Sequence, residues 1–154
     1  MINSFGTIIV LLCILFASST TTLGCPLELP TATISIKGYT LTAELATTPA
    51  ARACGLSHRD ELPKNHAMLF IYPDLRTISF WMKDTKIYLS IAFLDDAGRI
   101  FSIQDMTPMQ TARKYHSSRP AKYALEVNQG WISKRGIDVG DAVEMKLPAE
   151  LDIR

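Results

Sequence analysis

The segment TISFWMKDT, near the middle of the chain, carries side chains that could hold a ligand. Successive residues of a β-strand point to opposite faces, so a strand here directs Trp81 and Lys83 to one face. Phe80 and Met82 then take the other face as core residues. Trp81 would supply an apolar wall and Lys83 an ammonium group, a pair that suits an anionic ligand. The alternative is architectural: Trp81 packs in the core and Asp84 closes a turn after the strand.

A second candidate is Glu126, which stands inside the apolar run YALEVNQGW. Strand alternation puts Glu126 and Asn128 on the same face. Burying a lone carboxylate is costly, so Glu126 must lie at an edge, in an ion pair or in a cavity. One interpretation is a structural ion pair with Lys83. The other is a pocket that Glu126 shares with Asn128 and Trp131, where the free N–H groups of a following helix attract anions.

A third candidate is the segment 107–121, which has no apolar period and is predicted to be a long loop. Its cations include Arg113, Lys114 and Arg119, with no acidic residue among them. They could clamp an anionic ligand or contact phospholipid headgroups. The alternative is an ordinary solvated loop.

Other kinds of site are not indicated by the sequence. The spacing of the three histidines and Cys54 does not match a zinc site, so no metal site is expected. The histidines are His58, His66 and His116. The motifs of phosphate-binding loops, dinucleotide-binding folds and serine hydrolases are missing, so no cofactor is expected. With 16 basic and 15 acidic residues the net charge is +1. That balance excludes the strongly basic class of nucleic-acid-binding proteins.

The first 24 residues carry no charged side chain. Their apolar run, 7–17, is too short to span a bilayer alone. Small residues, Thr22 and Gly24, stand where a signal peptidase reads the chain before Cys25. The pattern predicts a signal peptide at 1–24 and an exported protein, with an uncleaved membrane anchor as the alternative.

Cys25 has two alternative fates. The sequence TLGC resembles the bacterial lipobox, which would make Cys25 a lipidated first residue that tethers the protein to the membrane. An oxidising compartment would instead let Cys25 and Cys54 form a disulfide. The protein is accordingly expected to be either periplasmic or a membrane-anchored lipoprotein.

The elements that position these residues are short. Residues 33–46 alternate apolar and polar around Lys37-Gly38, which predicts a hairpin. Thr48 and Pro49 are typical of a helix start, and Gly55 of its end. Further strands are predicted at AMLFIY, TISFWM, IYLSIAFLD, RIFSIQDM, KYALEV and AVEMKL, and a second helix at QGWISKR.

About seven short strands and two short helices favour a mostly β (α+β) fold. The expected architecture is a compact antiparallel sheet, barrel-like or sandwich-like. After the signal peptide, residues 25–32 form a linker, 33–147 a single domain and 148–154 a tail.

Several stretches together resemble the family called domain of unknown function 192 (DUF192). They are TPAARACGLSHRDELP, AMLFIYPD, SFWMKDT, LSIAFLDDAGRI, PMQT, YALEVNQGW and GIDVGDAV, and the resemblance runs from Leu41 to Lys146. It implies a small β-rich domain, often exported, without an established activity. The family usually has Asn at the place of Asp84 and Asp at the place of Ser90.

Three functions are compatible with this sequence. The first is a monomeric binding module for a small anionic ligand or an envelope protein, in a groove edged by Trp81, Lys83, Glu126, Asn128 and Trp131 with the basic loop as a lid. The second is an envelope enzyme with Glu126 as general acid or base. The third is a membrane-tethered assembly or quality-control factor.

Overall fold

The computed structural model describes residues 24, 25 and 27–154. The predicted signal peptide, residues 1–24, and the alternative anchor lie outside this part of the chain, apart from Gly24. Within it, no helix is long and apolar enough to cross a membrane.

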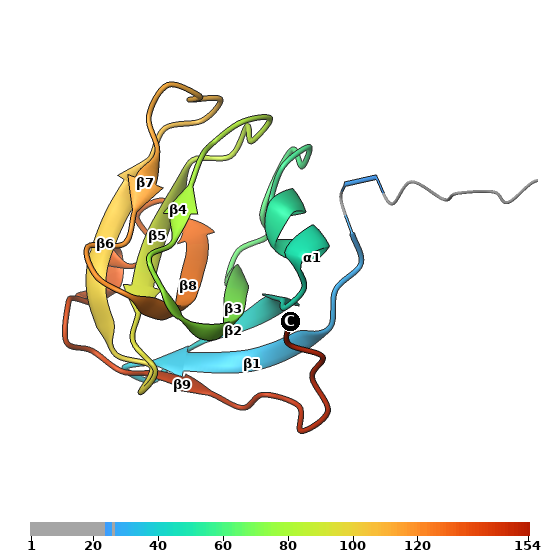
Figure 1. Ribbon diagram of the computed structural model, residues 1–154. Coiled ribbons are helices and arrows are strands. Elements are labelled where there is room, and N and C mark those ends of the chain that lie inside the picture. The colour runs from blue at the N-terminus through green and yellow to red at the C-terminus, as the bar shows by residue number, and fades with distance from the viewer. Residues whose placement is uncertain (1–23, 26) are drawn as a thin grey trace, which may run out of the picture.

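A curled sheet of seven strands forms the body of the domain (Figure 1). Its strands are β1 (Thr31–Ile36), β2 (Tyr39–Ala46), β3 (His66–Arg76), β5 (Leu89–Leu94), β6 (Ile100–Met106), β8 (Ala121–Asn128) and β9 (Val143–Met145). They lie in the order β6-β5-β8-β3-β2-β1-β9. The two outer strands approach each other, because Arg99 and Ala142 form an isolated bridge. The predicted mostly β, barrel-like architecture is thus confirmed.

One pair of neighbours departs from the antiparallel pattern. β2 and β3 are parallel and are joined through the helix α1 (Pro49–Cys54). Parallel neighbours require such a crossover because a tight turn cannot join them. The helix begins as predicted, with the Thr48 hydroxyl accepting a hydrogen bond from the N–H of Ala51 at 3.2 Å.

A second, two-stranded sheet contains β4 (Ser79–Phe80) and β7 (Tyr115–His116). In Figure 1 this pair lies in front of β5 and β8, with α1 beside it. β4 is shorter than the predicted strand TISFWM. β7 arises within the segment that was expected to be loop throughout.

The second predicted helix is wrong. The segment QGWISKR forms turns and a three-residue 3₁₀-helix, η1 (Ser133–Arg135). Gly130 and Gly136 have φ angles of +82° and +59°. Both glycines have left-handed backbone conformations, which an α-helix cannot include. The segment between them is too short for an α-helix.

The sheet has a hydrophobic core on each face. The first core takes side chains from all seven strands, among them Ile34, Leu69 and Leu125. The second lies between the central strands and the layer of α1, β4 and β7, and contains Phe70 and Phe80. Because both faces are covered, all six residues of β5 are buried.

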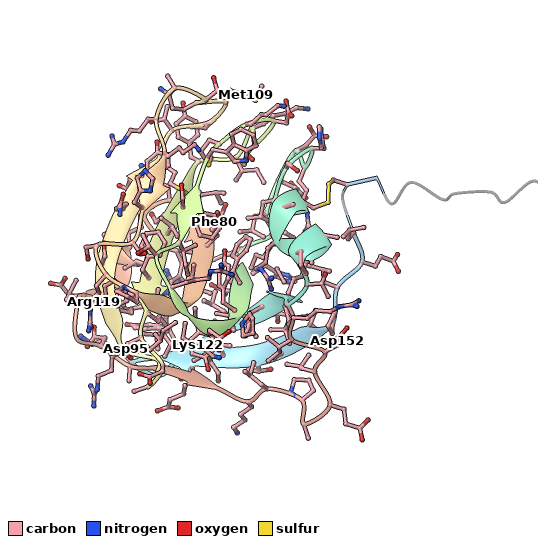
Figure 2. The ribbon with its side chains drawn as sticks, viewed as in Figure 1. Phe80, Asp95, Met109, Arg119, Lys122 and Asp152 are labelled. Carbon is pink, nitrogen blue, oxygen red and sulfur yellow. A yellow bond between two sulfur atoms is a disulfide. The ribbon has the colours of Figure 1, made fainter. Side chains whose placement is uncertain are left out.

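A disulfide joins Cys25 to Cys54 and so ties the segment before β1 to the end of α1 (Figure 2). Of the two alternatives for Cys25, the structure has the disulfide. A sulfur atom in a disulfide cannot at the same time carry a thioether-linked lipid.

Removing this cross-link should lower the free energy of unfolding. The disulfide closes a loop of 29 residues, and the entropy of such a loop corresponds to about 3.6 kcal/mol. Urea denaturation of Cys25→Ser, compared with the oxidised and reduced native chain, measures the effect. The reduced native protein should match the variant. Equal stability of all three proteins would contradict the expectation.

Candidate functional site

A cavity of about 170 Å³ lies between the end of α1 and β4, over β3 and β8. Its walls come from four places in the chain. They are Arg52, Ala53, Cys54, Gly55, Leu56 and Ser57 from α1 and the turn after it, Phe70 and Tyr72 from β3, Ser79, Phe80, Trp81, Lys83 and Thr85 from β4 and its loop, and Glu126 from β8. The structure therefore places Trp81, Lys83 and Glu126, three of the five residues expected to edge the groove, around one cavity.

Glu126 lies in the interior of the sheet, because β8 is paired on both sides. Its partners are Met68 of β3 and Ile91 of β5. The side chain is on the face covered by α1 and β4, and the residue is 4% exposed. Alternation predicted this correctly, since Leu125 and Val127 belong to the opposite core.

No ion pair within the described residues includes Glu126. The predicted structural ion pair with Lys83 is therefore wrong. Burial without a compensating charge raises the pKa of Glu126 from 4.5 to about 8. At neutral pH this carboxyl group is mostly protonated, so it can donate a hydrogen bond into the cavity. A strongly perturbed carboxyl group in a cleft is a common mark of a functional site.

Trp81 and Lys83 line the solvent side of the same cavity. Phe80 and Met82 are buried, whereas Trp81 is 51% exposed and Lys83 is exposed. The Nζ atom of Lys83 lies 5.5 Å from the centroid of the Trp81 ring, a cation–π arrangement. No ion pair within the described part of the chain includes Lys83, so its charge is available to a ligand.

Arg52 is a cavity residue that the sequence did not indicate. Its guanidinium group donates hydrogen bonds to the carbonyl groups of Thr47, Ile71 and Arg154. It also lies 4.7 Å from the centroid of the Tyr72 ring. A single arginine among the small residues of PAARAC is a weak signal, because surface helices often carry one. Arg52 mainly fixes the end of α1 against β3 and adds positive charge to the cavity wall.

Asn128 and Trp131 lie elsewhere, around a different cavity of about 450 Å³. The Asn128 amide donates to the carbonyl of Leu62 at 2.7 Å, and the Trp131 indole N–H donates to Asn65 Oδ1 at 3.0 Å. Asn128 is the last residue of β8 and is bonded to the segment before β3. The groove expected to contain these two residues together with Glu126 is therefore divided between two cavities.

The basic residues after β6 are also dispersed. Arg113 stacks on Tyr115 at 4.9 Å, and Arg119 pairs with Asp95 at 3.6 Å. In Figure 2 Arg119 and Asp95 lie together at one side of the domain, away from Phe80. Lys114 alone lies beside the site, where it lines a cavity of about 220 Å³ with Ser79, Phe80 and Trp81.

Asp84 has an architectural role, as the alternative interpretation proposed. Its φ angle is +55°, and its carbonyl accepts a hydrogen bond from the N–H of His58 at 2.8 Å. Asparagine and aspartate tolerate this left-handed conformation better than other residues with side chains. Ser90 is on the other face of the sheet from Glu126. Its hydroxyl group donates a hydrogen bond to the Asp105 carboxylate at 2.6 Å. The differences from the family at positions 84 and 90 thus concern separate places in the fold.

Substitution of Asp84 should therefore follow backbone preference. Asp84→Asn should leave the free energy of unfolding unchanged, and Asp84→Ala should lower it by about 1 kcal/mol because alanine disfavours positive φ. Urea denaturation of both variants measures this. An asparagine variant as unstable as the alanine variant would show that the carboxylate itself is needed.

Glu126 should make stability depend on pH in a specific direction. Between pH 4.5 and about 8 the folded carboxyl group holds a proton that the unfolded one has lost. The contribution of this protonated carboxyl group to the free energy of unfolding is therefore complete below pH 4.5. It is lost as pH rises through about 8. Relative to Glu126→Gln, the native protein should lose a few kcal/mol between about pH 5 and 9. Parallel urea curves for the two proteins across this range would contradict the raised pKa.

Comparisons with known proteins agree with this architecture. The model of the DUF192 family, described as "Uncharacterized ACR", matches residues 32–145. A proposed transcription regulator from Sinorhizobium meliloti 1021 has 30% identity and a TM-score of 0.73, over 78% of this chain and 97% of that chain. A protein of unknown function from Novosphingobium aromaticivorans DSM 12444 has 31% identity and a TM-score of 0.67, over 74% of this chain and 83% of that one. A search of curated proteins finds no match.

Proposed function

We propose that this protein, which belongs to the DUF192 family, is a binding module that holds a small anionic ligand in the cavity around Glu126. One observation carries the proposal. A buried carboxyl group without an ion-pair partner and an unpaired lysine line the same cavity, as far as the structure describes the chain. A solely structural role for Glu126 would favour a partner for its carboxyl group.

The cavity walls define the chemistry of the ligand. The ammonium group of Lys83 suits a carboxylate or another negative group at the solvent side. The protonated Glu126 can donate to a carbonyl or ether oxygen deeper inside. Phe70, Phe80 and Trp81 provide apolar walls between them. A cavity of about 170 Å³ is close to the size that holds a six-membered ring.

An exported location is part of this proposal. A persistent disulfide between Cys25 and Cys54 is typical of oxidising compartments such as the periplasm. In that setting the module would meet ligands or proteins of the cell envelope.

An enzyme is the second candidate, favoured by the raised pKa of Glu126. A carboxyl group with a pKa of about 8 can exchange a proton near neutral pH, as a general acid or base does. Lys83 would then orient the substrate rather than only retain it.

Binding of small carboxylates to variants tests the proposal. Ligand-observed NMR with a library of aromatic and cyclic carboxylic acids would identify binders. Lys83→Gln should lower the affinity for these binders by about tenfold, which corresponds to about 1.4 kcal/mol for one charge-assisted contact. Glu126→Gln should retain binding, because the amide also donates, whereas Glu126→Met should weaken it.

Lys86→Gln is the matched control. Lys86 stands three residues from Lys83 but pairs with Asp60 at 2.7 Å and does not line the cavity. Equal weakening by the two lysine variants, or no binding of any carboxylate, would contradict a specific anion site. If a bound compound is converted and Glu126→Gln abolishes conversion but not binding, the protein is an enzyme.

A further inference from the structure

The strand β4 has an unpaired backbone edge. β4 pairs only with β7, in antiparallel register. Ser117 N–H donates to the carbonyl of Ile78, and Ile78 N–H donates to Ser117 Oγ, both at 2.9 Å. Hydrogen-bonding direction alternates along a strand, so the N–H and C=O groups of Ser79 point away from β7. The same alternation, extended by one residue beyond β4, places the backbone groups of Trp81 on that side. Outside the β4–β7 ladder, no hydrogen bond of the described residues uses these groups.

The bonding of β7 supports the same alternation. The residue opposite Ser79 is His116. The carbonyl of His116 accepts a hydrogen bond from Gln104 Nε2 at 2.8 Å, on the side of β6. It is therefore directed away from β4, as expected for a pair that exchanges no backbone hydrogen bonds.

This free edge borders two cavities. Ser79, Phe80 and Trp81 line both the cavity over Glu126 and the smaller one beside Lys114. Ser79 and Trp81 are exposed. An exposed strand edge can accept a strand from another chain, and natural edge strands are often short, as β4 is. Here the exposed edge lies directly beside space that a side chain could fill.

The charges near the edge select the kind of partner. Lys83 lines the first cavity and Lys114 the second, and no ion pair of the described residues includes either. The single acidic residue in the two linings is Glu126, which is buried. A segment with acidic side chains is therefore complementary to this edge.

We propose that an extended acidic segment of another protein adds to β4 as a third strand of the small sheet. Its backbone pairs with the N–H and C=O groups of Ser79 and Trp81. One apolar side chain enters the cavity over Glu126, and acidic side chains lie near Lys83 and Lys114. Addition of a peptide strand to an exposed sheet edge is a known mode of peptide recognition. It rests on the proposed function and specifies the ligand as part of a protein.

Proline at position 79 tests the backbone contact. Ser79→Pro removes an N–H that points away from β7, at a place where edge strands tolerate proline. Ser79→Ala keeps this N–H and is the matched control. The probe is a fluorescent library of hexapeptides that combine one apolar with two acidic residues, measured by fluorescence polarisation. Ser79→Pro should weaken binding of the selected peptides at least tenfold. Ser79→Ala should weaken it less than twofold.

A change in the peptide provides a second, independent measurement. Methylation of the backbone nitrogen that pairs with β4 should reduce binding to the native protein at least tenfold, while methylation at the next residue should not. This comparison holds even if Ser79→Pro fails to fold, which a thermal melt would reveal.

The outcomes separate this proposal from the previous one. If small carboxylates bind in the Lys83-dependent manner but no peptide binds, or if peptide binding ignores both Ser79→Pro and N-methylation, strand addition is overturned and the ligand cavity remains. If neither carboxylates nor peptides bind, both proposals fail. Tight peptide binding without any small-carboxylate binding supports strand addition and removes the free small anion as the ligand.

Discussion

The candidate site depends on how the second face of the sheet is covered. The first face closes on side chains from all seven strands. The second face is covered by three short elements, α1, β4 and β7, of six, two and two residues, and by loop residues such as Leu56, Leu62 and Ile87. Among the described residues no backbone hydrogen bond joins α1 to β4, and the space between them is the cavity over β8. An incomplete cover above a central strand thus makes the interior of the sheet accessible to a ligand.

Glu126 remains in this position because it can stay neutral. An ionised carboxylate without a partner would be expensive in such a place, whereas a protonated one loses far less hydration free energy. The consequence is an uneven charge distribution. At neutral pH the cavity carries the positive charges of Arg52 and Lys83 and little negative charge. An anionic group is favoured there by the same burial that suppresses ionisation of Glu126.

The period-two pattern predicted the correct faces because strand geometry is local. In β8, Glu126 points away from the core that contains Leu125. Trp81 and Lys83 follow the end of β4, and both are exposed. Predictions failed where the deciding contact is distant in sequence. β7 forms only because Tyr115 pairs with Phe80, and the parallel contact of β2 and β3 requires the crossover through α1.

The sequence by itself determined the type of most elements. It also determined which side chains of a strand lie on the same face. Alternation and turn preferences act between near neighbours, so they can be predicted from a short segment. Only the tertiary structure decided that Lys83 and Glu126 line one cavity, while Asn128, two residues further along β8, contacts the segment before β3. Strand register and the position of α1 over the sheet decide this, and both arise from packing between segments far apart in the chain.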